Sequence, residues 1–144
     1  MKTRPTIIAA AIAASGLTLA LNAIGAPASH LPMTHKEGEV TYLTGGIGKT
    51  EADAVKRAAR RYPLELEFVK KATPRNEYLA DVTVHIKDAH DKTVLDVKAD
   101  GPFLLASMPA GKYTVSAERN GKTEQRKVEI AAKDHRRVVF EWLS

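Results

Sequence analysis

The fold is decided by residues 113–130, which carry the pattern of a β-hairpin. They read Tyr113-Thr114-Val115-Ser116-Ala117-Glu118-Arg119, then Asn120-Gly121, then Lys122 to Ile130. Apolar and polar side chains alternate before the Asn-Gly pair, as they do in a strand with one buried face. Asn-Gly accepts the positive φ angles of a type I′ turn, which is the strongest short-range hairpin signal. The stretch predicts two antiparallel strands, Tyr113–Arg119 and Lys122–Ile130.

Further short strands are expected on both sides of this hairpin. One helix is expected at Thr50–Arg61, where Thr50 and Asp53 form a capping-box-like start and Pro63 ends the helical pattern. Turn residues separate most of the expected strands at spacings of about 8–12 residues, which is typical of a β-sandwich. The expected strands are Glu39–Thr44, Leu64–Phe68, Tyr78–Ile86, Thr93–Ala99, Phe103–Ala106 and Arg136–Trp142. The chain is therefore expected to be mainly β, a β-sandwich with one N-terminal helix between two strands.

Side-chain alternation also predicts the core. One expected strand places Tyr78, Ala80, Val82, Val84 and Ile86 on a single face. The residues expected to share one core are Tyr113, Val115, Ala117, Phe68, Val82, Val84 and Phe140. The glutamates between Leu64, Leu66 and Phe68 fall on the opposite face of their strand, and the pattern directs them away from this core.

Two neighbouring segments resemble a known family. Asp100-Gly101-Pro102-Phe103-Leu104-Leu105 is followed by Met108-Pro109-Ala110-Gly111-Lys112-Tyr113-Thr114-Val115. This arrangement resembles the carboxypeptidase regulatory-like (transthyretin-like, prealbumin-type) β-sandwich family, with Met108 in place of the usual Leu. The resemblance covers roughly Tyr78 to Ile130 and implies a transthyretin-like fold. The chain is also similar to small exported bacterial proteins that carry this module.

The resemblance implies no activity. The related 5-hydroxyisourate hydrolases end in Tyr-Arg-Gly-Ser, whereas this chain ends in Glu141-Trp142-Leu143-Ser144. Carboxypeptidase activity in the family belongs to a separate catalytic domain. His-Glu-x-x-His and Gly-x-Ser-x-Gly patterns are absent from the sequence. No catalytic, cofactor-binding or metal-binding residue is therefore assigned, and the chain is not expected to be an enzyme.

The first 28 residues have the composition of a signal peptide. Lys2 and Arg4 precede a mostly apolar stretch, Ile7 to Leu21, and Ala26-Pro27-Ala28 supplies a small-residue exit before Ser29. Cleavage after Gly25 and retention as an uncleaved anchor are the alternatives. A periplasmic or secreted protein is expected, with no stable membrane span after cleavage. Residues 29–38 are expected to be a flexible leader, and residues 39–144 a single domain.

Composition narrows the remaining functions. The chain has 144 residues and no cysteine, so it fits one domain without disulfides, Cys-based zinc sites or thiol nucleophiles. Removing Lys2 and Arg4 from its 22 basic residues leaves 20 against 17 acidic residues, a mild net charge of +3. The basic residues do not cluster with aromatic residues, so nucleic acid is not an expected partner.

A glycine-rich segment, Thr44-Gly45-Gly46-Ile47-Gly48-Lys49-Thr50, resembles a phosphate-binding loop before a helix. Leu43 stands where an ordinary loop of this kind needs its first glycine. Thr44 stands where the deviant type carries a lysine, and no apolar strand ending in aspartate follows to hold magnesium. The segment is expected to be a glycine turn that binds no nucleotide.

A second cluster combines His85, Asp88, His90 and Asp91, whose side chains are suitable metal ligands. The leading expectation is nevertheless a non-catalytic periplasmic binding or interaction module, whose partner is an unknown protein or glycan of the cell envelope. The alternatives are a structural accessory of an envelope complex and a carrier of a small ligand or metal that uses His85, Asp88 and His90. The candidate contact surface comprises the Pro109–Lys112 turn, the Asn120-Gly121 hairpin and the helix end at Arg60-Arg61.

Overall fold

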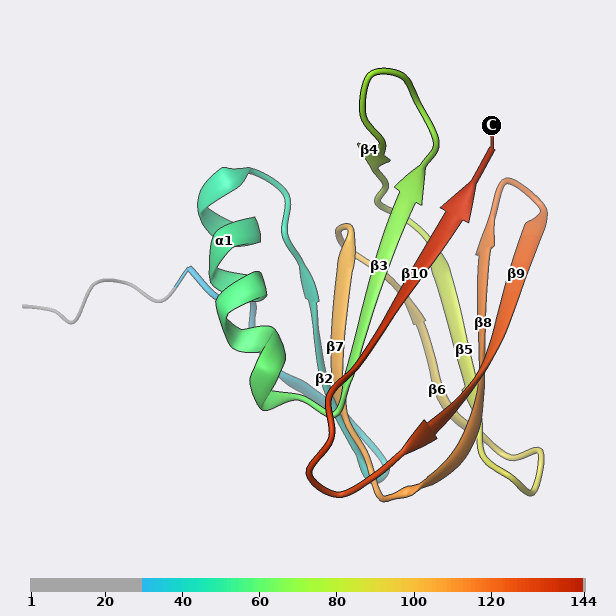
Figure 1. Ribbon diagram of the computed structural model, residues 1–144. Coiled ribbons are helices and arrows are strands. Elements are labelled where there is room, and N and C mark those ends of the chain that lie inside the picture. Colours follow the sequence, from blue (N-terminus) through green and yellow to red (C-terminus); the bar gives the residue numbers. More distant parts are fainter. Residues whose placement is uncertain (1–29, 144) are drawn as a thin grey trace, which may run out of the picture.

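The computed structural model describes residues 30–143, which form two facing β-sheets and one short helix (Figure 1). The expected signal peptide, with its cleavage site before Ser29 or after Gly25, lies outside the described residues. Within residues 30–143, no helix is long and apolar enough to span a membrane. The chain is mainly β, as expected, and its two sheets have the arrangement of a β-sandwich.

The first sheet has the strand order β1-β2-β7-β3-β10, with β4 paired to β3. Its strands are β1 (His35–Glu37), β2 (Val40–Gly45), β7 (Phe103–Ser107), β3 (Leu64–Lys70), β10 (Arg136–Trp142) and β4 (Glu77–Tyr78). The β3–β10 pair is parallel, with Arg136 opposite Leu64, and the other pairs are antiparallel. The last strand therefore lies beside a strand that begins about halfway along the chain.

The second sheet has the order β6-β5-β8-β9 and is antiparallel throughout. Its strands are β6 (Thr93–Lys98), β5 (Thr83–Lys87), β8 (Gly111–Arg119) and β9 (Lys122–Ile130). Asn120 and Gly121 join β8 to β9 with φ angles of 51° and 75°, as a type I′ turn requires. The expected hairpin is confirmed.

The main core fills the space between the two sheets. It contains all seven residues that alternation assigned to it: Tyr113, Val115, Ala117, Phe68, Val82, Val84 and Phe140. Trp142 joins Phe140 in this core and donates its indole N–H to the Lys122 carbonyl, 3.1 Å away. The guanidinium of Arg126 lies 5.6 Å from the centre of the Phe140 ring. These contacts tie β9 to β10 where the two sheets meet.

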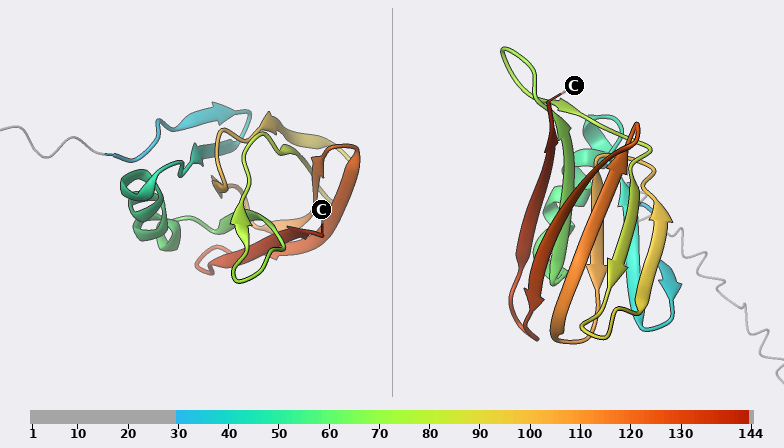
Figure 2. Two further views of the ribbon diagram at one scale, coloured as in Figure 1. Left: turned by 90° about the horizontal axis from the view of Figure 1, so that it is seen from above. Right: turned by 90° about the vertical axis from the view of Figure 1, so that its right-hand side faces the viewer.

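Helix α1 (Lys49–Ala58) continues into the short helix η1 (Ala59–Arg61) and covers the outer face of the first sheet (Figure 2). Its apolar side, with Val55 and Ala58, packs on side chains of β2 and β7 in a second, smaller core. The expected capping box does not form. Gly48 occupies the N-cap position without a side-chain cap, and the carboxylate of Asp53 instead pairs with Lys49 one turn away, at 2.7 Å.

The single strand expected over Tyr78–Ile86 is wrong, because the chain crosses from one sheet to the other within this range. Tyr78 ends β4 in the first sheet, and β5 begins at Thr83 in the second. Asp81 adopts a positive φ of 61° at the crossing. Tyr78 is consequently 51% exposed and contacts Phe103 on the helix side, while Leu79 enters the main core. The alternating pattern of apolar residues continues through the crossing, so alternation alone cannot detect that the chain changes sheets there.

Part of the segment expected to be a flexible leader, residues 29–38, is a strand. β1 (His35–Glu37) pairs antiparallel with β2, and the ring of His35 stacks on that of Tyr42. Leu31 packs against the smaller core under the helix. β1 has only three residues, which is too short for alternation to reveal a strand.

Tyr113 should be a main determinant of stability. Replacing it with alanine removes a buried ring and should lower the free energy of unfolding by about 3–5 kcal/mol. Tyr113→Phe keeps the ring and loses only the hydroxyl contact to the Pro109 carbonyl, so its cost should be about 1 kcal/mol. Thr114→Ala, which changes the opposite face of β8, should cost less than ~0.5 kcal/mol. Urea denaturation of the three variants checks this order, and equal midpoints for Tyr113→Ala and Thr114→Ala would contradict the assignment of the core face.

Candidate functional site

Three turns and the start of β8 meet at one end of the sandwich. The β1–β2 turn at Gly38, the β5–β6 turn at 88–92 and the β7–β8 turn at 108–110 all lie at the lower end in Figure 1. Tyr113 lies among them, because alternation along β8 directs its ring inward just after the last of these turns. We refer to this region, residues 37–40, 88–94 and 108–114, as the loop end.

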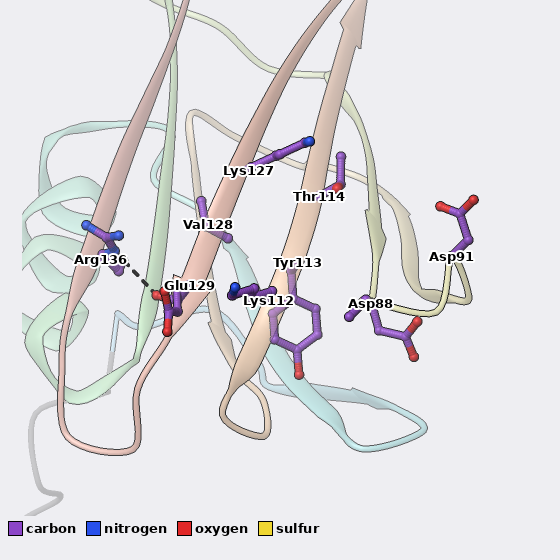
Figure 3. Close-up of a pocket in the computed structure, with 10 residues that line it drawn as sticks. Asp88, Asp91, Lys112, Tyr113, Thr114, Lys127, Val128, Glu129 and Arg136 are labelled. Atoms are coloured by element: carbon purple, nitrogen blue, oxygen red, sulfur yellow. Dashed lines mark hydrogen bonds between the residues drawn. The ribbon is translucent and has the colours of Figure 1, made fainter.

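Tyr113 lies between two hollows of the loop end. One hollow, of about 480 Å³, is drawn in Figure 3, where Asp88 and Asp91 lie on one side of the tyrosine ring and Glu129 and Arg136 on the other. The second hollow, of about 510 Å³, is lined by Glu37, Gly38, Glu39, Val40, Asp88, Lys92, Thr93, Val94, Pro109 and Tyr113. Both volumes are in the usual range for binding sites of small molecules or peptide side chains.

The second hollow combines an apolar surface with carboxylates. Val40, Val94 and Pro109 provide the apolar part, together with the edge of Tyr113. Glu37 and Glu39 add negative charge from the first sheet, opposite Lys92 on the β5–β6 turn. An apolar surface with a few polar groups at its border is suited to binding and orienting a ligand.

Asp88 and Tyr113 direct their hydrogen bonds to the chain's own backbone. The Asp88 carboxylate accepts the amides of His90, at 2.8 Å, and Lys92, at 3.0 Å, and these bonds hold its pKa below the ordinary value. The Tyr113 hydroxyl donates to the Pro109 carbonyl at 2.7 Å. Burial raises the pKa of Tyr113, with a further contribution from the negative charges of Asp88 and Glu39. The two groups stabilise the turns, and at neutral pH the tyrosine is neutral and the aspartate charged.

The structure does not bring His85, Asp88 and His90 together as metal ligands. His85 lies on the outer face of β5 and pairs with Asp96 of β6, with 3.2 Å between Nδ1 and Oδ1. Asp88 is engaged within its own turn, to which His90 contributes only its backbone amide. In residues 30–143, no group of three or more His, Asp or Glu side chains could hold a metal ion.

The glycine-rich segment lies between β2 and α1, as a phosphate-binding loop would. One of its amides is already occupied, because Gly46 donates its N–H to the Glu51 carboxylate at 2.8 Å. A Cβ at Gly46 would fall 2.5 Å from the Phe103 ring, so this glycine permits close packing against β7. The ammonium group of Lys49 donates to the Asp53 carboxylate, at 2.7 Å, and so points along the helix rather than toward the loop. At the start of the helix, the Glu51 carboxylate therefore accepts an amide that a bound anion would otherwise use.

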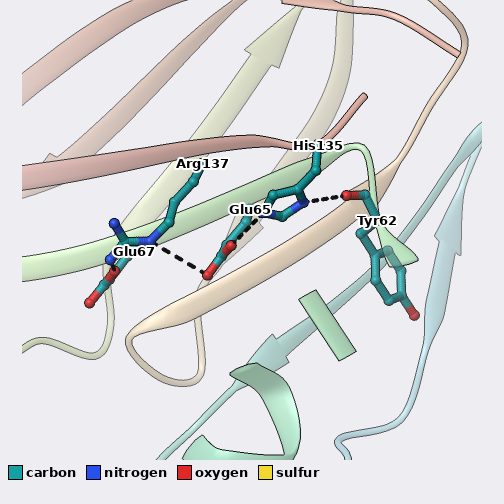
Figure 4. A network of polar contacts seen from close by, with 5 residues as sticks. All are labelled: Tyr62, Glu65, Glu67, His135 and Arg137. Carbon is teal, nitrogen blue, oxygen red and sulfur yellow. Dashed lines mark hydrogen bonds and ion pairs between the residues drawn. The ribbon is translucent and has the colours of Figure 1, made fainter. Parts of the chain in front are cut away.

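The outer face of the first sheet carries a polar cluster that the sequence did not predict. Glu65 and Glu67 of β3 are each only 6% exposed, although alternation directs them away from the main core. Arg137 of β10 pairs with both glutamates, and His135 contacts Glu65 (Figure 4). We call these four side chains the β3–β10 cluster. Arg137 and His135 lie against the two glutamates, and nothing in the spacing of the glutamates predicts these partners.

The three parts of the expected contact surface do not lie together. The Pro109–Lys112 turn lies at the loop end and the Asn120-Gly121 hairpin at the opposite end, while Arg60-Arg61 end the helix at the side of the first sheet (Figure 1). The first turn borders the second hollow through Pro109 and the first hollow through Lys112. Only this part of the expected surface coincides with a hollow bordered by Tyr113.

Comparison with known proteins yields no match to any protein-family model or any curated protein sequence. The class of the protein is accordingly defined by its fold and its loop end. It is a β-sandwich with a helix on the outer face of one sheet and hollows where three turns meet.

The glycine-rich segment should not bind nucleotide. Titration calorimetry with Mg·ATP should give no heat of binding, because Glu51 already accepts the Gly46 amide and Lys49 is paired with Asp53. Lys49→Ala, which removes the lysine of the loop, should behave identically. A micromolar dissociation constant that Lys49→Ala abolishes would contradict this prediction.

Arg137 should contribute to the stability of the fold although its side chain is partly exposed. Arg137→Ala removes the cation from two carboxylates that remain buried, and should lower the free energy of unfolding by about 1–3 kcal/mol. The larger loss of stability expected for breaking a fully buried ion pair does not apply, because the Arg137 side chain is 55% exposed and water screens its charge. The matched control is Arg136→Ala, whose guanidinium contacts only the Glu129 carbonyl at 3.4 Å. Equal urea midpoints for the two variants would contradict this prediction, because they would show that Arg137 is not needed to stabilise the buried charges of Glu65 and Glu67.

Proposed function

We propose that the protein is a non-catalytic binding module of the cell envelope, periplasmic or secreted, which uses its loop end to bind a protein or glycan partner. The observation that carries this proposal is the position of Tyr113 between two adjoining hollows. The ring is fixed by the core, and the hydroxyl by Pro109, so the hollows lie on a rigid support. A preorganised surface loses little conformational entropy on binding.

The arrangement of polar groups supports binding rather than catalysis. Asp88 and Tyr113 are the titratable groups shared by both hollows, and each is engaged with backbone groups. Catalysis by a general base requires a group that reaches a nucleophile or a substrate proton. The second hollow instead suits an extended ligand. Its apolar residues can contact apolar groups of such a ligand, and the carboxylates of Glu37 and Glu39 can accept hydrogen bonds from it.

We further propose a transthyretin-like, carboxypeptidase regulatory-like identity for the sandwich. The support is the packing of the segments that carry the sequence resemblance. Met108 and Tyr113 flank the β7–β8 turn, and both are buried in the main core. Leu104 enters the same core, while Phe103 and Leu105 face the helix. The Met108–Tyr113 turn thus connects a strand of one sheet to a strand of the other, and its two apolar side chains anchor the connection in the core between them.

Two substitutions of one type separate this proposal from its alternatives. Thr93→Arg places a long side chain in the second hollow, and Thr123→Arg makes the same change at an exposed position on β9, near the Asn120-Gly121 hairpin. Each purified protein is immobilised and exposed to a periplasmic extract and to solubilised envelope glycans, and the retained species are quantified by mass spectrometry.

The expected result is a protein or glycan retained by the wild type and by Thr123→Arg, but at least ~10-fold less by Thr93→Arg. Equal retention by both variants would place the contact elsewhere and contradict the role of the loop end. Native mass spectrometry of the untreated protein distinguishes the carrier alternative, which requires a bound ion or small molecule.

A further inference from the structure

His135 makes two hydrogen-bond contacts, and both partners are acceptors. Its Nδ1 lies 2.8 Å from the carbonyl oxygen of Tyr62, and its Nε2 lies 2.8 Å from Oε2 of Glu65 (Figure 4). A backbone carbonyl can only accept, and an ionised carboxylate can only accept. A neutral imidazole carries a single N–H and can donate to only one of them. The geometry therefore requires one proton more than a neutral histidine beside an ionised glutamate provides.

We propose that His135 and Glu65 hold this additional proton and form a pH-dependent clasp. The clasp joins the β9–β10 connection, residues 131–135, to β3 and to the residue that follows η1. The proton resides on the imidazole, as an imidazolium that donates to both acceptors, or on the Glu65 carboxyl, which then donates to Nε2. Either location leads to the same dependence on pH, because removing the proton leaves two acceptors facing each other.

Charged groups from β3, β9, β10 and the β9–β10 connection surround the clasp. The charged groups of the β3–β10 cluster are Glu65 and Glu67 from β3 and Arg137 from β10. The shallow hollow bordered by His135 adds Glu129 of β9, Asp134 of the connection and Arg136 of β10. Arg61, at the end of η1, is exposed to solvent. Within the cluster and the hollow, the groups around the clasp are therefore four carboxylates and two guanidinium groups.

The clasp is expected to open as the pH rises. The pair keeps both hydrogen bonds while it holds the additional proton and loses one when that proton is released. The connection is otherwise held by few contacts: the Asp134 amide donates to Ala131 at 3.2 Å and the Arg136 amide to Pro63 at 2.8 Å. The β3–β10 pairing beyond Arg136 does not depend on the proton. Release should therefore loosen the connection without unfolding the sandwich.

The position of the clasp links it to the loop end. Arg136 follows His135 directly and lines the hollow drawn in Figure 3, as does Glu129 at the other side of the connection. Opening of residues 131–135 would therefore alter one wall of that hollow. The clasp itself requires no ligand, and its test is independent of whether the proposed binding function is correct.

Hydrogen exchange followed by NMR between pH 5.5 and 8.5 tests the clasp in the full chain. After correction for the intrinsic effect of pH on exchange, protection of the hydrogen-bonded Asp134 and Arg136 amides should fall about fivefold as pH rises, the equivalent of one hydrogen bond. The ¹⁵N shifts of the His135 ring should change over the same range. At low pH they should report either a doubly protonated ring or a ring that is hydrogen-bonded to a protonated Glu65. At high pH they should report a neutral ring with a single N–H and no bond to a protonated carboxyl group. Protection that is constant over this range, with a single neutral tautomer of His135 throughout, would overturn the proposal.

Glu65→Gln identifies the group responsible. The glutamine amide can donate to Nε2 of a neutral imidazole, so both contacts survive without an additional proton and protection should no longer vary with pH. His135→Gln, which removes the titrating ring, should give the same constant protection if Glu65→Gln does not fold. His85→Gln is the matched control, because His85 pairs with Asp96 on the exposed sheet, and it should retain the wild-type dependence. A pH dependence that persists in Glu65→Gln or His135→Gln would overturn the proposal.

Discussion

Burial of β3 on both faces constrains the rest of this structure. Leu64, Leu66 and Phe68 enter the main core on one face, while Glu65 and Glu67 are covered on the other. Unpaired buried carboxylates would be strongly destabilising, so the fold must supply cations to them. Arg137 meets this need, and it reaches the glutamates because β10 lies parallel to β3 in a register that places Arg137 beside Glu65. The closing strand is therefore specified by charge as well as by the apolar side chains of Phe140 and Trp142.

The apolar side chains on the outer face of the first sheet explain the position of the helix. The outer face of the first sheet presents apolar side chains from β2 and β7 beside the charged side chains of β3. The helix connects β2 to β3 and packs its apolar side on Leu43, Phe103 and Leu105. The glycine-rich segment before it allows the chain to leave β2 and pass close to the Phe103 ring. Its likeness to a phosphate-binding loop thus arises from a shared geometric need, a tight strand-to-helix connection, and Glu51 occupies the position of the anion.

The two ends of the sandwich are built differently. At one end, the tight Asn120-Gly121 turn joins β8 to β9 within a single sheet. At the other end, turns from both sheets meet around Tyr113, and the β9–β10 connection adjoins them through Arg136. Loops on a rigid sandwich are the usual place for binding residues, since the sheets position them and their sequence is free to vary. This asymmetry is why the loop end, rather than the hairpin end, is the candidate contact surface.

The sequence by itself determined most of the strands, the hairpin and the inner face of the core. Alternation is a local property that follows from the geometry of a strand, so Val115, Ala117 and Phe140 could be assigned to the core without a structure. Only the tertiary structure decided the crossing at Asp81, the strand at His35–Glu37 and the burial of Glu65 and Glu67. The burial of the two glutamates depends on β10, a strand distant in sequence. β1 and β4 instead pair with their near neighbours in the chain, β2 and β3, and each is too short for alternation to reveal it. Local pattern carries no information about which segments meet, and for that reason the β3–β10 cluster and its His135 clasp were visible only in the folded chain.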